Sequence, residues 1–186
     1  AEPWIKNEEE TVNTVIKEAI ASIGENINLR RFEKYDSDGF LQGYVHMGGK
    51  IGVIVDFEGE LNEETQATAK NIAMHIAASS PQYISREDIS DSVIEKEEQI
   101  YKEQMLNEGK PEHIIDNIVE GKMEKYFTQV CLKEQEYVRD EDMTVGELLQ
   151  DSTLAVNAFT RFELGEGIEE EEEDFAAEVM EEMNKE

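Results

Sequence analysis

The segment from Ile51 to Phe57 constrains the fold most, because large apolar residues recur along it at every second position. These residues are Ile51, Val53, Val55 and Phe57. This period predicts a β-strand with one face in a hydrophobic core. Because antiparallel sheets commonly bury a single face, the pattern favours an antiparallel sheet.

Further strands are expected on both sides of this segment. Residues 26–35 and 40–47 are rich in strand-forming residues, and Gly48 and Gly49 supply a turn into the strand that begins at Ile51. The sequence Asp-Ser-Asp-Gly at 36–39 is typical of a tight hairpin turn. Residues 157–164 predict a late strand that returns to the same sheet.

Helical periodicity predicts helices that flank the sheet. Residues 8–23 carry apolar side chains at three- and four-residue spacing, and this helix should end before Gly24. Asn62 can cap a second helix, whose small apolar face would approach the sheet closely. That face consists of Ala69, Ile72, Ala73, Ile76 and Ala77. Capping signals at 85–88 and 144–147 mark two further helix starts.

Residues 92–131 change in character and predict a pair of charged helices. Gly109 and Pro111 end one helix and begin the next. The second helix has one narrow apolar seam, as expected of a helix that packs on a single partner. The seam consists of Ile115, Val119, Met123, Tyr126 and Val130. We therefore expect an antiparallel helical hairpin that projects from the core.

These elements together predict an α+β fold. It has a small antiparallel sheet of three strands plus the late strand, covered by helices, with an inserted coiled-coil hairpin and a C-terminal helix. The expected bounds are 1–90 for the core subdomain, 91–133 for the hairpin, 134–168 for the return to the core and 169–186 for a C-terminal helical module. The acidic run at 169–173 is interpreted either as a solvated helix start or as a patch that steers the chain toward a basic partner.

The net charge excludes several kinds of partner. Seventeen Lys and Arg against 45 Asp and Glu give −28, which repels phosphate backbones and anionic lipid surfaces. We therefore expect no direct binding of nucleic acid or membranes, and no apolar run is long enough for a transmembrane helix. The single cysteine, Cys131, excludes an internal disulfide and is expected to be a buried helical residue.

No arrangement of residues predicts an enzyme, a cofactor site or a metal site. His46, His75 and His113 have no second ligand at metal-binding spacing. Residues 36–39 resemble the start of a calcium loop, but Met47 stands where such a loop needs its bidentate glutamate. The glycines around Lys50 join strands and do not lead into a helix, so they do not predict phosphate binding. We expect a protein that acts by contact.

Several ordered stretches carry a family resemblance. IGENINLRRF at 23–32, RFELGEGI at 161–168 and DFAAEV at 174–179 resemble the core and C-terminal module of bacterial-type translation elongation factor Ts. YVHMGGKIGV, AMHIAAS, GKP and VEG are similar to the same family in the same order, at 44–53, 73–79, 109–111 and 119–121. The resemblance implies a guanine nucleotide exchange factor for the GTPase elongation factor Tu, in the bacterial cytoplasm or in an organelle.

The resemblance also implies partner-binding residues. In that family the sheet region with the His-Met-Gly-Gly turn docks on the C-terminal β-barrel domain of Tu, and the C-terminal module packs against the GTPase domain. By position, the residues implied are His46, Met47, Gly48, Asp174, Phe175 and Val179. The alternatives are an ordinary strand-end role for the histidine and an internal core role for the phenylalanine. A homodimer also remains open.

The resemblance is incomplete on the N-terminal side. Members of the family begin with a three-helix module and carry a Thr-Asp-Phe-Val motif near the magnesium site of Tu, and this sequence contains neither. We therefore expect a truncated form that binds Tu but promotes GDP release weakly. The competing hypothesis is an acidic interaction or scaffold module that uses its helical hairpin.

Overall fold

The computed structural model describes residues 3–4 and 7–167 of the 186-residue chain. It divides into two compact units, Ala1–Asp36 and Ser37–Glu186. The expected C-terminal helix, with Asp174, Phe175 and Val179, lies outside the described residues. The domain bounds predicted from the sequence stay a prediction.

The first unit contains a short antiparallel strand pair followed by a helix. The Thr11 hydroxyl caps the helix by accepting a hydrogen bond from the Thr14 amide at 3.2 Å. Gly24 ends it in the left-handed conformation, with φ of 81°. The helix therefore ends as predicted, but the expected start at residue 8 is wrong, because residues 7–11 pair as a strand. The bounds are β1 (Pro3–Trp4), β2 (Asn7–Thr11) and α1 (Val12–Ile23).

The strand expected at residues 26–35 does not form. These residues have no regular secondary structure, and the side chains of Leu29 and Phe32 are 55% and 75% exposed. Ile27 and Leu29 are two residues apart but Phe32 comes three later, so a strand would turn them to opposite faces. The tight hairpin turn expected at 36–39 is therefore also wrong, since no strand precedes it.

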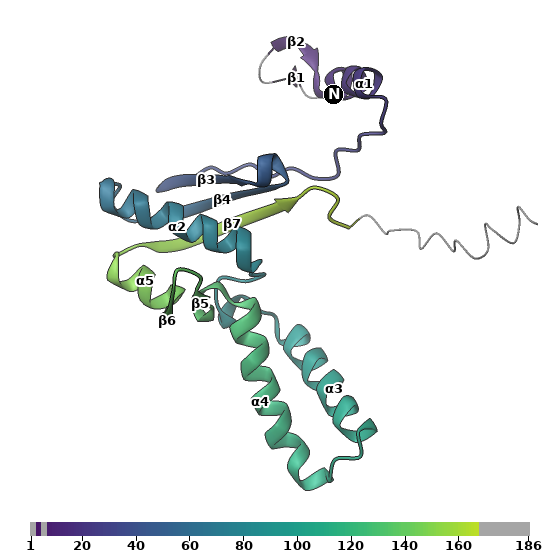
Figure 1. Cartoon of the computed structure of the whole chain (residues 1–186), viewed down its shortest axis with the longest axis vertical. Helices are drawn as coiled ribbons and strands as arrows, with labels where there is room; N and C mark the ends of the chain where they lie inside the picture. Colours follow the sequence, from purple (N-terminus) through teal and green to yellow (C-terminus); the bar gives the residue numbers. More distant parts are fainter. Residues whose placement is uncertain (1–2, 5–6, 168–186) are drawn as a thin grey trace, which may run out of the picture. The chain divides into compact units, whose positions relative to one another are not determined.

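The second unit is built on a three-stranded antiparallel sheet in the order β3-β4-β7 (Figure 1). β3 pairs with the central strand in continuous register, from Phe40 opposite Phe57 to His46 opposite Ile51. The late strand pairs with the other edge of β4. The α+β class and the late returning strand are confirmed, with two strands before it instead of three. The bounds are β3 (Phe40–His46), β4 (Ile51–Glu58) and β7 (Ala155–Glu163).

The helix α2 (Glu63–Ser79) covers one face of this sheet. Asn62 caps it as predicted, because its side-chain oxygen accepts hydrogen bonds from the Glu64 and Thr65 amides at 3.0 Å each. The predicted apolar residues of the helix are buried against the alternating residues of the central strand. This core includes Ile51, Val53, Val55, Phe57, Ala69, Ile72, Ala73, Ile76 and Ala77.

The predicted helical hairpin is formed by α3 (Asp91–Asn107) and α4 (Glu112–Val130), and it projects from the sheet and its helix (Figure 1). Its seam differs from the prediction in one residue, because Phe127 is buried in place of Tyr126, which is only half-buried. The buried residues of α4 are Ile115, Val119, Met123, Phe127 and Val130. Their spacing of mostly four residues is that of a helix with a single packed side.

A charged cluster around Arg86 ties the base of the hairpin to the core. Its guanidinium donates to the Glu134 carboxylate at 2.5 and 2.6 Å and to the Glu124 carboxylate at 2.9 and 2.7 Å. It also lies 4.3 Å from the ring centroid of Phe127. Hydrogen bonds from Arg86 lower the pKa of the Glu124 carboxyl. Two-point bonding of both carboxylates fixes the direction in which the hairpin leaves the core.

The chain returns from the hairpin to the sheet through short elements. The Leu132 amide donates to the Tyr83 carbonyl at 2.8 Å, and Thr144 caps the last short helix with the capping box predicted for it. Cys131 is fully buried as predicted, but it follows the end of α4 in an extended conformation and is not helical. Burial raises the pKa of its thiol to about 11, so the thiol stays protonated. The bounds are η2 (Arg86–Asp88), η3 (Leu132–Glu134), β5 (Glu136–Tyr137), β6 (Asp140–Thr144) and α5 (Val145–Asp151).

Candidate partner-binding site

The turn between β3 and β4 contains three of the residues that the sequence implies for partner binding. His46 is the last residue of β3, and η1 (Met47–Gly49) follows it. Three consecutive residues of this turn have positive φ, 50°, 68° and 102°. The Lys50 carbonyl accepts a hydrogen bond from the Leu164 amide at 2.8 Å, so the turn is tied to the end of β7.

Met47 is unusual because it has a large side chain in the left-handed conformation. Its φ is 50°, a region that costs a non-glycine residue about 1 kcal/mol or more. Its side chain is also 63% exposed, so burial does not offset this cost. A strained backbone that displays an apolar side chain to solvent is typical of a contact site.

Met47→Gly is expected to raise the free energy of unfolding by about 0.5–1 kcal/mol, because glycine adopts this φ without strain. Met47→Ala is the matched control, since it also removes the exposed side chain but keeps the Cβ that causes the strain. Urea unfolding monitored by circular dichroism measures both. Equal stability of the two variants would contradict the strain at this position.

His46 is exposed and is held from one side by Tyr44. The Tyr44 hydroxyl lies 2.9 Å from Nδ1 of His46, and the two rings stack with centroids 5.8 Å apart and planes 29° apart. Tyr44 packs against the core of the unit. Two contacts with Tyr44 therefore hold the histidine ring, and within the described residues its other ring nitrogen, Nε2, has no hydrogen-bond partner.

The other two histidines do not join this site. His75 is fully buried on α2, where it is hydrogen-bonded to Gln135, and His113 is exposed at the start of α4. Within residues 3–4 and 7–167, no group of three or more His, Cys, Asp or Glu side chains could hold a metal ion. In the same part of the chain, no helix is both long enough and apolar enough to cross a bilayer.

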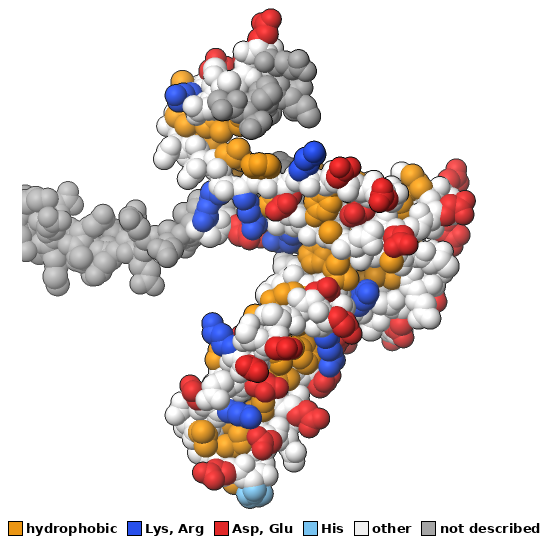
Figure 2. All heavy atoms as spheres, turned by 180° about the vertical axis from the view of Figure 1, so that it is seen from behind, with side chains coloured by type: hydrophobic (Ala, Val, Ile, Leu, Met, Phe, Trp, Pro, Cys, Tyr) orange, Lys and Arg blue, Asp and Glu red, His pale blue; other side chains and the backbone are white. Residues whose placement is uncertain are grey.

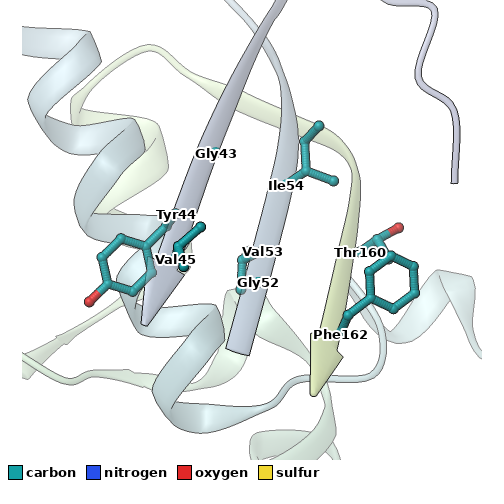
Figure 3. Close-up of a pocket in the computed structure, with 8 residues that line it drawn as sticks. All are labelled: Gly43, Tyr44, Val45, Gly52, Val53, Ile54, Thr160 and Phe162. Atoms are coloured by element: carbon teal, nitrogen blue, oxygen red, sulfur yellow. The ribbon is translucent and has the colours of Figure 1, made fainter. Parts of the chain in front are cut away.

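Next to the turn lies an apolar surface that the sequence interpretation did not single out. We call it the outer sheet face, because it is turned away from α2. A shallow hollow of about 300 Å³ lies on it, and in Figure 3 Ile54 and Phe162 point away from α2. The alternation along β4 could have revealed it, since Gly52 and Ile54 occupy its even positions. The face comprises Leu41, Gly43, Val45, Gly52, Ile54, Asp56, Ala158, Thr160 and Phe162, and its residues around the hollow are uncharged.

The hairpin presents a different surface. Figure 2 shows many acidic side chains on it, interspersed with basic ones. The ion pairs between residues of the hairpin itself are long and exposed, Lys102 with Asp116 at 3.6 Å and Lys110 with Glu108 at 3.9 Å, and such pairs contribute little to stability. This surface is suited to solvation or to contact with a basic partner.

Comparison with known proteins decides the family. The family model described as "Elongation factor TS" matches residues 2–166. The chain belongs to the elongation factor Ts family. The match confirms the resemblance found in the sequence and makes the chain a relative of translation elongation factors.

Two relatives show how close this relationship is. Elongation factor Ts of Halothermothrix orenii is 71% identical over 184 residues, which cover 99% of this chain and 62% of that protein. Elongation factor Ts of Limosilactobacillus reuteri (strain DSM 20016) is 44% identical over 183 residues, which cover 97% of this chain and 61% of that protein. The chain therefore spans about three fifths of the length of these relatives.

Proposed function

We propose that this elongation factor Ts family chain binds elongation factor Tu and promotes release of GDP from it, acting by contact and without chemical catalysis. The observation that carries the proposal is the family match over residues 2–166. The exposed turn at His46, Met47 and Gly48 supports it, because this turn has the strain and exposure of a contact site. Asp174, Phe175 and Val179 are proposed as a second contact on the sequence resemblance alone. A cytoplasmic location is proposed with this function.

The proposed mechanism is differential affinity. A protein that binds nucleotide-free Tu more tightly than Tu with GDP weakens the hold of Tu on GDP by the same factor, because binding of the two ligands is linked. Contacts alone are sufficient for this effect. The chain therefore has to bind Tu through surfaces whose fit changes when the nucleotide leaves.

The test measures binding and exchange separately. Titration calorimetry gives the affinity of the chain for Tu with and without GDP, and a fluorescent GDP analogue reports its release from Tu at saturating chain. We expect the chain to speed up release of GDP. We also expect it to bind nucleotide-free Tu more tightly than Tu with GDP, by the same factor by which it weakens the affinity of Tu for GDP. Binding without faster release would leave only a Tu-binding module, and absence of binding would overturn the proposal.

Variants of the turn test where Tu binds. His46→Ala is expected to weaken binding about tenfold, a typical loss for a side chain that anchors an interface. His113→Ala is the control, because this exposed histidine lies on the hairpin and should leave the affinity unchanged. Equal effects of the two variants would remove the turn from the proposed interface.

The second candidate is an acidic interaction or scaffold module that uses the helical hairpin, which the charge of −28 and the exposed acidic surface of α3 and α4 favour. Capture of partners from a translating extract separates the two candidates. Recovery of Tu supports the exchange function, and recovery of a different basic protein without Tu supports the scaffold. The native mass of the chain tests the homodimer.

A further inference from the structure

Tyr44 and His46 form a pair on one face of β3. Residues two apart on a strand point to the same side, and here the hydroxyl oxygen and Nδ1 are 2.9 Å apart. The tyrosine ring packs against the core formed by α2 and the sheet, so the core sets the position of the hydroxyl. The histidine follows that position, since its ring also stacks on the tyrosine ring.

The chemistry of the two groups decides the direction of the hydrogen bond. A phenol hydroxyl is a better donor than acceptor, and the unprotonated nitrogen of a neutral imidazole is a strong acceptor. The favoured arrangement has the Tyr44 hydroxyl donating to Nδ1 of His46. Which imidazole nitrogen carries the proton is set by the hydrogen bond that the other one makes. The proton of the neutral ring is therefore on Nε2, the nitrogen that faces away from Tyr44.

We propose that Tyr44 is a positioning residue that holds His46 as an Nε2–H donor, so that the docking partner must meet it with an acceptor oxygen. The proposal rests on the proposed function, in which His46 contacts Tu. A carbonyl or carboxylate oxygen on the partner would complete the hydrogen bond. A donor at the same place would meet a second donor and leave both without a hydrogen bond, which is a source of specificity.

The free chain tests the tautomer without any partner. Nitrogen-15 NMR of the imidazole rings distinguishes the Nε2–H tautomer from an exchanging mixture. His75 is an internal reference, because its Nδ1 accepts from the Val138 amide at 3.3 Å and its proton must be on Nε2. His113 is the exposed reference, with no side-chain hydrogen bond in the described part of the chain.

We expect the neutral His46 signals to match those of His75 and to move toward those of His113 in Tyr44→Phe. Tyr101→Phe is the matched control, because it removes a hydroxyl on the hairpin and keeps the ring that stacks with Lys122. His46 signals that already match those of His113 in the natural chain, or that do not move in Tyr44→Phe, would overturn the proposal.

A double-mutant cycle tests the consequence for docking on Tu. Tyr44→Phe should weaken binding about fivefold, the effect of about one hydrogen bond, and less than twofold when His46 is already alanine. Tyr101→Phe should have no effect. If His46→Ala weakens binding but Tyr44→Phe does not, the positioning role fails and the proposed function stands. If His46→Ala has no effect, the proposed docking through the turn fails, whatever the NMR result.

Discussion

Gly39→Ala is expected to lower the free energy of unfolding by about 3 kcal/mol, because the chain has no room for a Cβ at this position. A Cβ on Gly39 would lie 2.0 Å from the Phe57 carbonyl oxygen and 3.0 Å from its carbonyl carbon. Both are backbone atoms of the central strand, so neither can rotate away. The Phe57 side chain is fully buried, and any shift of its backbone therefore disturbs the core.

Gly43→Ala is the matched control for this prediction. Gly43 lies within β3, four residues after Gly39, on the outer sheet face, and a Cβ there would meet nothing within 4 Å. Alanine should be neutral or should stabilise the strand by up to about 1 kcal/mol, because glycine loses more backbone entropy on folding. Urea unfolding of both variants gives the comparison. A loss in the free energy of unfolding below about 1 kcal/mol for Gly39→Ala would show that the chain before β3 can shift to make room for the Cβ.

This close approach explains why the segment at 36–39 misled the sequence prediction. Its aspartates, serine and glycine are typical turn residues, but in the structure Ser37 and Gly39 contact the central strand instead of forming a hairpin turn. The Ser37 hydroxyl donates to the Asp56 carboxylate and accepts from the Gly39 amide, which draws the incoming chain onto the central strand. Turn composition reports local preference, whereas this contact joins residues that are 19 apart in sequence, a separation that local patterns do not report.

The elements with a strict period were predictable, and those set by a single contact were not. The alternation along β4, the capping box at Thr144 and the break between α3 and α4 all appear in the structure as the sequence predicts. The seam of α4 contains Phe127 in place of Tyr126, because two adjacent aromatic residues both fit the apolar side of a helix. Partner geometry, which the sequence does not specify, decides between them.

The candidate site divides in the same way. The turn residues His46, Met47 and Gly48 were named through resemblance to a family, and no spacing rule singled them out. The left-handed conformation of Met47 could not be predicted, because the two glycines that follow it can adopt positive φ more easily and would be expected to do so alone. The contact between the Tyr44 and His46 side chains requires a strand at these residues, and that strand was predicted. The sequence did not show that the two side chains touch, although residues two apart on a strand share a face.

His75→Ala is expected to lower the free energy of unfolding by about 3–4 kcal/mol, since it creates a cavity and leaves buried polar groups unpaired. His75 is fully buried on α2, and its Nε2 lies 2.8 Å from Oε1 of Gln135. The side-chain Nε2 of Gln135 in turn donates to the backbone carbonyl of Gln129 at 2.7 Å. The network therefore joins the helix that covers the sheet to the end of α4. His113→Ala, at an exposed position, should stay within about 0.5 kcal/mol of the natural chain.

The same network predicts a loss of stability in mild acid. The Nδ1 of His75 accepts from a backbone amide and its Nε2 donates to an amide oxygen, so a second ring proton has no acceptor. Burial lowers the pKa of His75 below its ordinary value of 6.5, against a smaller opposite effect of the hydrogen bond to Gln135. Protons then bind the unfolded chain more readily than the folded one. Stability due to this group is complete above pH 6.5 and is lost as the pH falls below it.

His75→Gln isolates this titration from that of the many carboxylates. Glutamine can still donate to the Gln135 oxygen but carries no titrating group, whereas the carboxylates titrate in both proteins and cancel in the difference. Between pH 7 and pH 5.5 the natural chain should lose about 1 kcal/mol more than His75→Gln, the loss for one histidine that stays neutral when folded. Urea unfolding at a series of pH values measures it. Parallel stability curves would mean that the folded chain accepts the proton, and the neutral network around His75 would then be wrong.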